Sequence, residues 1–299
     1  MHTIQSAMKD RLRAAWRIRQ ANFPAVIGFD YPVDMGLISI TGTACALDCA
    51  HCGRKYLQHM TPVWEAVERV GNAPGLLISG GCDAQGRVPV TRETLQLLDK
   101  LRPGRTLVWH VGLIEEPELR MILPYIDVVS FDFVGDDATI REVYGLERNV
   151  ADYIATYKLL RRSVRVIPHL TIGLRGGELG HERPALDILS ELGCDALVFL
   201  VLIPTPGTRY ADRQPPPVAA VVDLLAEARL RFPHTPISLG CMRPRGSYRR
   251  ALDPLAVRAG LNRIVNPAPE AVALAQDLGL EIERSTGCCV LSLQPLSDG

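Results

Sequence analysis

Short apolar runs recur along the chain, and between them apolar residues repeat every three or four positions, the spacing of an amphipathic helix. The runs predict strands at Leu37–Thr41, Leu76–Gly80, Thr106–Val111, Asp127–Asp132, Arg165–Ile172, Ala196–Ile203, Pro236–Cys241 and Asn262–Val265. Continuous apolar strands that alternate with helices indicate a parallel sheet covered by helices. The eight units predict an α/β fold, a (β/α)8 barrel of the TIM type, with a doubly wound open sheet as the alternative.

One domain is expected to span residues 1–299. No long repeat is present, and the stiff Gln-Pro-Pro-Pro run at 214–217 lies between a strand and its helix rather than between domains. Residues 1–30 are expected to form an N-terminal helix and an arm against the barrel. Residues 280–299 are expected to form a C-terminal tail over the barrel rim, the edge at which the carboxyl ends of the strands meet.

Charge and hydropathy narrow the class of protein. The chain has 33 Lys and Arg against 33 Asp and Glu, so it lacks the cationic excess of a nucleic-acid-coating or polybasic membrane surface. Its longest apolar run, Ala196 to Ile203, is too short to cross a bilayer, and the first twenty residues carry charges in place of a secretory core. We therefore expect a cytoplasmic protein without nucleic-acid or membrane partners.

Three of the eight cysteines fall within eight residues, at Cys45, Cys49 and Cys52, with the spacing C-x3-C-x2-C. Such bunching favours a metal site or cluster in a reducing compartment over a disulfide framework. A structural zinc site is one reading, although it needs a fourth ligand and His51 faces away if Cys52 faces in. An iron–sulfur cube accepts three cysteines and leaves one iron open to a small molecule.

This motif, in the loop after the first predicted strand, resembles the signature of the radical S-adenosylmethionine (SAM) superfamily. The resemblance implies a four-iron, four-sulfur (4Fe–4S) cluster whose open iron binds SAM, and cleavage of SAM to a 5′-deoxyadenosyl radical. It also implies flavodoxin or ferredoxin as reductant. Cys82 stands where the family's commonest pattern has an acidic residue, and His51 replaces the usual aromatic residue. The residues expected to contact SAM are His51, Ser79, Gly80, Gly81, Ser130, Asp132, Ile203 and Pro204.

The remaining cysteines suggest a subclass. Cys82 and Cys241 follow predicted strands at the rim, where barrel enzymes place their chemistry, and Cys288-Cys289 lies in the tail. The segments 203–208, 240–246 and 256–267 and the Cys288-Cys289 pair resemble biotin synthases and the related two-component lipoyl synthases. That likeness implies a second, sulfur-donating 4Fe–4S cluster on Cys82, Cys241, Cys288 and Cys289, with Arg243 as a reserve ligand, so that Cys82, Cys241 and Arg243 are expected to take part in catalysis.

The lipoyl-synthase resemblance implies an octanoylated lipoyl domain or glycine-cleavage H protein as partner, and a second radical SAM synthase protein. The rival interpretations are a radical SAM enzyme that performs a rearrangement or methyl transfer, a non-catalytic iron–sulfur or zinc module, and a second cluster that carries electrons. Asp132 is equally a candidate strand-end cap. His110 and His169 are candidates for substrate positioning or acid–base work, although histidines of this kind are more often part of a hydrogen-bonded core.

Overall fold

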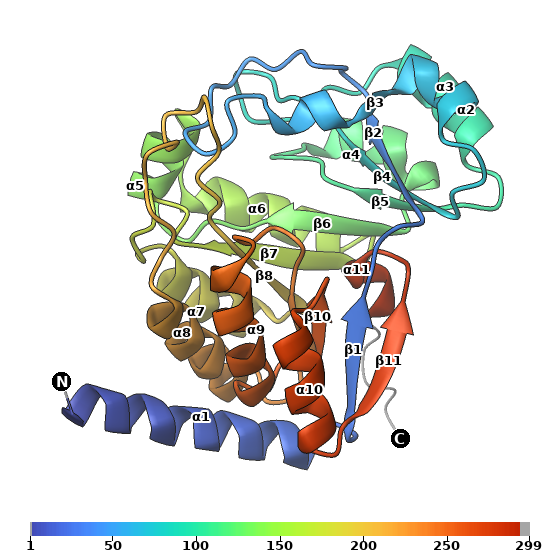
Figure 1. Cartoon of the computed structure of the whole chain (residues 1–299). Helices are drawn as coiled ribbons and strands as arrows, with labels where there is room; N and C mark the ends of the chain where they lie inside the picture. Colours follow the sequence, from blue (N-terminus) through green and yellow to red (C-terminus); the bar gives the residue numbers. More distant parts are fainter. Residues whose placement is uncertain (1, 294–299) are drawn as a thin grey trace.

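The computed structural model describes residues 2–293, with side chains from residue 8 onward except those of residues 289 and 292. Its strands form one parallel sheet in the order β11-β1-β10-β9-β8-β7-β6-β5-β4-β2-β3 (Figure 1). The strands are β1 (Val26–Asp30), β2 (Met35–Ser39), β3 (Thr61–Pro62), β4 (Gly75–Ser79), β5 (Thr106–Trp109), β6 (Val128–Asp132), β7 (Val166–Ile172), β8 (Leu197–Val201), β9 (Ile237–Leu239), β10 (Arg263–Val265) and β11 (Glu281–Ser285).

Each of the eight predicted strands is present, as β2 and β4 to β10. The predicted α/β barrel of the TIM type is confirmed, and the sheet curves as a partial barrel with β3 and β11 as its edge strands. The prediction lacked β1, β3 and β11. Strand β3 has two residues and β11 has one apolar residue, so neither carries a clear apolar pattern. Strand β1 does carry one, Val-Ile-Gly-Phe, within the segment expected to form the N-terminal arm.

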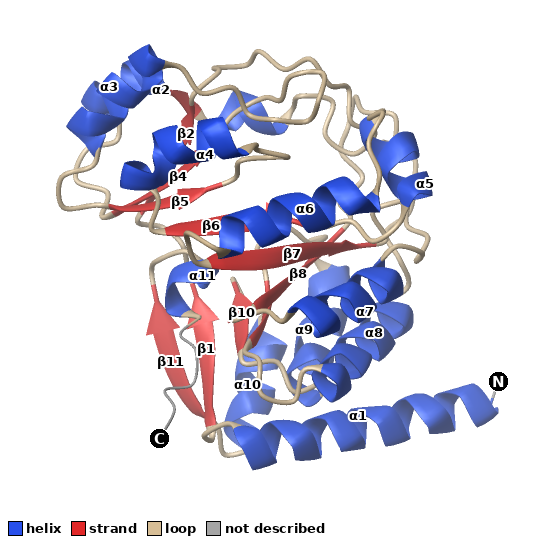
Figure 2. Ribbon diagram, turned by 180° about the vertical axis from the view of Figure 1, so that it is seen from behind, coloured by secondary structure: helices blue, strands red, loops and turns tan. Residues whose placement is uncertain are grey.

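The helices lie mostly on the outer face of the sheet (Figure 2). They are α1 (His2–Asn22), α2 (Val63–Arg69), α3 (Arg92–Leu101), α4 (Glu116–Ile122), α5 (Asp137–Thr139), α6 (Val150–Arg161), α7 (Glu182–Leu192), α8 (Val218–Arg231), α9 (Ser247–Arg258), α10 (Pro269–Asp277) and α11 (Cys289–Ser292). The 3₁₀ turns are η1 (Tyr56–His59) and η2 (Leu123–Tyr125), and η3 (Ile140–Tyr144) is a π-helix. Within residues 2–293, no helix combines the length and apolar character needed to cross a bilayer.

The N-terminal segment contains a helix, as expected, and its predicted arm is the strand β1. Helix α1 lies across the end of the barrel at which the strands begin, and packs on α8 (Figure 1). Strand β1 joins the sheet between β10 and β11. Asp30 of β1 accepts from the Arg263 guanidinium of β10, at 2.6 and 3.0 Å. The guanidinium lies where a side chain at Gly28 would be, so Gly28 makes room for this buried ion pair.

Successive strand residues pack into two different cores because side chains alternate across a sheet. Residues such as Leu107, Phe131 and Leu170 belong to the outer core between sheet and helices. Their neighbours Val108 and Ile167 belong to a smaller core inside the barrel. The same alternation places His110, Ser130, Asp132 and His169 on the inner face. The inside of the barrel, bounded by that face, is called the lumen below.

The C-terminal segment enters the lumen after crossing the rim. Strand β11 runs parallel to β1, and α11 then packs inside the barrel. Val290 joins Val108, Val128 and Ile167, and its carbonyl accepts from Arg165, which directly precedes β7. Residues 281–293 thus differ from the predicted tail over the rim, since they form an edge strand and a helix that fills the amino end of the lumen. The remainder of that tail, 294–299, lies outside the described residues.

Candidate functional site

The three bunched cysteines lie in the loop after β2, at the carboxyl end of the sheet (Figure 1). A tight turn joins the last two, because the N–H groups of Cys52 and Gly53 both donate to the carbonyl of Cys49, at 3.1 and 2.9 Å. Gly53 and Arg54 both adopt left-handed backbone conformations, with φ of 49° and 63°. Arg54 then donates back to the carbonyl of Leu47 at 3.2 Å, so the loop closes on itself.

Two distant segments fix the backbone of this loop. The N–H of Ala50 donates to the carbonyl of Val143 in the π-helix η3 (2.7 Å), and the carbonyl of Ala50 accepts from Tyr210 (3.0 Å). Arg209 also donates to the carbonyl of Asp48 (3.1 Å). π-Helical turns are rare and often occur at functional sites. The cysteine loop is therefore positioned by the segments that follow β6 and β8.

The glycine-rich edge after β4 lies directly against the cysteine loop. The N–H of Gly81 donates to Oγ1 of Thr41 (2.7 Å), and the carbonyl of Cys82 accepts from Ala46 (2.7 Å). A Cβ at position 81 would lie 2.0 Å from the carbonyl oxygen of Ala44 and 2.5 Å from Cβ of Cys45. Only glycine permits this approach, so Gly81 sets the distance between the two segments.

The thiols at this site oppose one another's ionisation. Burial raises the pKa of Cys49 to about 12, and the charges of Cys52, Cys82 and Cys45 add to the rise. Burial also raises the pKa of Cys82 to about 12, with Cys45 as the largest contributing charge. Iron ions would relieve this repulsion, since thiolates bind metals in their ionised form. The donor set thus fits an iron–sulfur cluster.

A site for a single metal ion has a different geometry. Among the side chains that the structure describes, no three His, Cys, Asp or Glu residues are grouped so that they could bind one metal ion. An iron–sulfur cube binds each cysteine at a different iron, so its ligands need not converge on one point.

His51 lies inside the cysteine loop with an unmet hydrogen-bonding capacity. Its ring packs against Tyr144 (centroids 5.7 Å apart) and Tyr56 (6.3 Å). Its buried Nδ1 has no hydrogen-bond partner among the described residues. Burial lowers the pKa of His51 to about 4, against a smaller opposing effect of Asp132, so the ring is neutral at pH 7. An orphaned buried nitrogen is costly, and a bound group at the predicted SAM site would be in a position to satisfy it.

The other predicted SAM contacts reach the same end of the barrel from three strands. Ser79 ends β4, Ser130 and Asp132 lie on the lumen face of β6, and Ile203-Pro204 follows β8. The loop after β8 touches the cysteine loop, since Oγ1 of Thr205 lies 3.2 Å from the hydroxyl of Tyr56. The structure therefore brings these residues toward the carboxyl end of the sheet.

His110, Asp132 and His169 form a polar cluster on three adjacent strands of the lumen wall. Nδ1 of His110 lies 3.5 Å from Oδ2 of Asp132, and the two imidazole rings are 5.8 Å apart. Asp132 keeps 53% of its side chain exposed, so the cluster is open to the lumen. The sequence interpretation treated these histidines as minor signals. Their shared position at the ends of consecutive strands was the available clue that they meet.

The charge states in this cluster differ. Burial lowers the pKa of His110, but hydrogen bonding to Asp132 and the charges of Asp132 and Cys288 raise it by more, so the net shift is upward. Burial lowers the pKa of His169 to about 4, and Nδ1 of that ring pairs with the carbonyl of Ile167 at 3.0 Å. A neutral His169 must donate from Nδ1 in this bond, which leaves Nε2 as an acceptor.

Replacing Asp132 by asparagine is expected to lower the pKa of His110 below its ordinary value, because burial is then opposed only by Cys288. The measurement is an NMR titration of the histidine Cε1 protons in cluster-free protein. His59, which lies in η1 away from this cluster, is the internal control. An unchanged His110 titration would contradict the assigned pairing.

The predicted auxiliary set falls into two groups. Cys82 contacts the first cysteine loop, as its N–H donates to Sγ of Cys45 (3.3 Å). Cys241 and Cys288 influence each other: burial raises the pKa of Cys241, Cys288 raises it further, and Arg243 opposes the rise. Cys241 is accessible to solvent although much protein surrounds it, as expected for a side chain facing a lumen. The side chain of Cys289 lies outside the described residues.

Arg243 is fully buried and its guanidinium is occupied. It donates to both carboxylate oxygens of Asp253 (2.7 and 2.9 Å), to the carbonyl of Gly240 (2.7 Å) and to that of Asn266 (3.2 Å). Binding iron would require these bonds to break. Arg243 thus joins the end of β9 to α9. Its guanidinium has no free nitrogen for the predicted catalytic and ligand roles.

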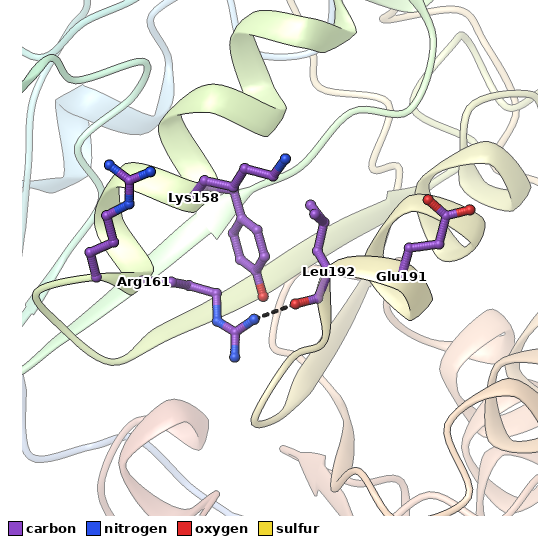
Figure 3. A pocket seen from close by; sticks show the side chains of 6 residues that line it. Lys158, Arg161, Glu191 and Leu192 are labelled. Carbon is purple, nitrogen blue, oxygen red and sulfur yellow. Dashed lines mark hydrogen bonds between the residues drawn. The ribbon is translucent and has the colours of Figure 1, made fainter.

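A separate hollow of about 360 Å³ lies between the ends of α6 and α7 (Figure 3). Lys158, Arg161 and Glu191 line it, and Arg161 donates to the carbonyl of Leu192. These helix ends lead into the starts of β7 and β8. The hollow is therefore at the opposite end of the barrel from the cysteines, and its arginine closes a helix end.

Solved structures with a similar fold include methylornithine synthase (PylB), with TM-score 0.65, 13% identity, and coverage of 93% of this chain and 90% of that one. The hydrogenase maturase HydG from Carboxydothermus hydrogenoformans gives TM-score 0.68 and 14% identity over 97% and 74% of the two chains. The HMG-CoA lyase from Brucella melitensis gives TM-score 0.52 and 11% identity over 90% and 95%. No family model and no curated protein matches the sequence. At these identities the likeness establishes the barrel fold, and the chemistry depends on the site.

Proposed function

We propose that the protein is a radical SAM enzyme, in which Cys45, Cys49 and Cys52 bind a 4Fe–4S cluster and SAM occupies the remaining iron. The observation that carries this proposal is the C-x3-C-x2-C loop itself, held at the carboxyl end of a parallel barrel against Gly81. When bound, the cluster and SAM supply a 5′-deoxyadenosyl radical that removes hydrogen from a substrate carbon. SuiB from Streptococcus suis, whose structure was solved bound to S-adenosylmethionine, has a similar fold (TM-score 0.53, 12% identity, 74% of this chain and 52% of that one).

Other residues at the carboxyl end of the barrel would bind SAM and exclude water. Ser79, Gly80 and Gly81 offer a narrow polar edge to SAM, and His51 offers the unpaired Nδ1. Ser130, Asp132, Ile203 and Pro204 complete the predicted contacts. The lumen wall excludes bulk water below the opening, because Val108, Ile167 and Val290 pack there. A radical formed at the opening would be shielded by this wall.

Anaerobic reconstitution tests the cluster. We expect the triple variant Cys45→Ala/Cys49→Ala/Cys52→Ala to bind about four fewer irons per chain than the unmodified protein, and to form no 5′-deoxyadenosine from SAM under reduction. Cys194→Ala is the matched control, because Cys194 precedes β8 at the other end of the barrel. Equal iron content in the triple variant would contradict the proposal, and SAM cleavage by that variant would do so as well.

The substrate class we propose is a protein-bound octanoyl chain, with the enzyme acting as a sulfur-inserting component of a lipoyl synthase. In support, Cys288 lies close enough to Cys241 and to His110 to raise the pKa of both. A second 4Fe–4S cluster bound there would offer sulfide to a substrate radical in the lumen. The sequence-based ligand set for that cluster is Cys82, Cys241, Cys288 and Cys289, but Cys82 lies beside the first cysteine loop, which leaves the other three as its candidate ligands. The proposed partners are an octanoylated lipoyl domain or glycine-cleavage H protein, a second radical SAM protein, and flavodoxin or ferredoxin.

Sulfur insertion is tested by separating two products. In Cys241→Ala and in Cys288→Ala, we expect 5′-deoxyadenosine to form while sulfur in the octanoyl product, measured by mass spectrometry, is lost. Unchanged sulfur content in both variants would contradict the donor role. A sulfur-free product from the unmodified enzyme would favour a rearrangement or methyl transfer instead.

A further inference from the structure

Cys82 is fastened to the first cysteine loop through its own backbone. Its N–H donates to Sγ of Cys45 (3.3 Å), and its carbonyl accepts from the N–H of Ala46 (2.7 Å). The two contacts join Cys82 to the side chain of Cys45 and to the backbone of the next residue. Because the glycine before it allows the segments to touch, Cys82 cannot shift away without breaking both bonds.

Four thiols therefore share one neighbourhood, three from the loop after β2 and one from the loop after β4. The backbone N of Cys82 lies 3.3 Å from Sγ of Cys45, so the Cys82 side chain starts directly beside that thiol. The absence of a side chain at Gly81 allows this approach. A cube bound by three cysteines has one iron without a protein ligand, and Cys82 would be the fourth thiol available to it.

We propose that Cys82 binds the open iron when SAM is absent, and that SAM displaces it. This inference rests on the proposed cluster at Cys45, Cys49 and Cys52. The thiol of Cys82 releases its proton to solvent when the iron–sulfur bond forms. When the amino and carboxylate groups of SAM take that iron, the bond breaks and Cys82 regains a proton. The exchange transfers no electron.

Such a ligand would protect the cluster at a cost in affinity for SAM. The apparent dissociation constant of SAM rises in inverse proportion to the fraction of protein whose open iron is unoccupied. If Cys82 occupies that iron about nine-tenths of the time, removing it tightens SAM binding about tenfold. Without Cys82, the same iron has no protein ligand and becomes the first that a mild oxidant removes.

The test uses the full chain with the auxiliary ligands removed, as Cys241→Ala/Cys288→Ala/Cys289→Ala, so that one cluster remains. Cys82→Ala and Cys82→Ser are added separately, with Cys194→Ala as control. Each protein is reconstituted without oxygen and treated with ferricyanide, with and without SAM. The readouts are the iron content and the EPR signal of a three-iron cluster, and equilibrium dialysis gives the affinity for SAM.

We expect Cys82→Ala to lose about one iron of four and to show the three-iron signal, while the parent and Cys194→Ala keep all four. SAM should protect Cys82→Ala. Cys82→Ser should fall between parent and alanine variant, because its oxygen is a weaker ligand for iron. Equal iron loss and equal SAM affinity with and without Cys82 would overturn the inference alone. A parent that binds no iron would overturn the proposed function instead.

Discussion

A Gly81→Ala variant is expected to cleave SAM about a hundredfold more slowly, because a displacement of about 1 Å in a positioned group can cost that factor. The added Cβ would lie 2.0 Å from the carbonyl oxygen of Ala44 and 2.5 Å from Cβ of Cys45. Backbone cannot yield as a flexible side chain can, so the cysteine loop must move away from β4. The measurements are 5′-deoxyadenosine formation and iron content after reconstitution.

Gly180→Ala is the matched control for this variant. A Cβ there would meet only Oδ2 of Asp136, at 3.7 Å, which is ordinary contact. We expect it to keep the iron content and the SAM cleavage of the parent. If Gly81→Ala also kept both, the contact between the two segments would not set the geometry of the site.

Replacing Arg243 by methionine is expected to lower the free energy of unfolding by about 3–5 kcal/mol, the usual cost of leaving one partner of a buried ion pair uncompensated. Both side chains of the Arg243–Asp253 pair are fully buried. Asp253 also accepts from the N–H of Ala268 (2.9 Å), so it would retain that donor but lose its paired guanidinium. Denaturant unfolding monitored by circular dichroism measures the change.

The double variant Arg243→Met/Asp253→Asn is expected to recover part of the loss, because it removes the unpaired charge and keeps an acceptor for Ala268. Arg120→Met is the control on an exposed pair, Arg120–Glu116, and should change stability little. If Arg243→Met kept its stability and lost iron, Arg243 would be a ligand, as its sequence context suggested.

The strands could be predicted because their signal is local. Runs such as Arg165–Ile172 carry enough β-branched and apolar residues to stand out, and the structure has β7 at Val166–Ile172. Strand β11 reads Glu-Ile-Glu-Arg-Ser and has one apolar residue, so only its parallel pairing with β1 makes it a strand. That pairing joins segments far apart in sequence, and no local pattern reports it.

The candidate site shows the same division. The spacing of Cys45, Cys49 and Cys52 within one loop made the first group predictable. Whether Cys82 lies with that group or with Cys241 depends on the approach of two loops, which the Gly81 contact decides. The family resemblance implied a ligand role for Arg243 near Cys241. Its partner Asp253, however, lies on a helix ten residues later in the chain. Burial of this kind follows from packing and not from residue type.

Helix α11 occupies the inside of the barrel near the ends at which β6 and β7 begin, because Val290 packs there with Val128 and Ile167. In the proposed enzyme, SAM, the substrate and their products would therefore share the carboxyl end. A substrate chain that enters first would stand between solvent and the cysteine loop, and one that leaves late would delay the exchange of spent SAM. Sharing one entrance would impose an order on binding and release, and product-inhibition patterns in steady-state kinetics would report that order.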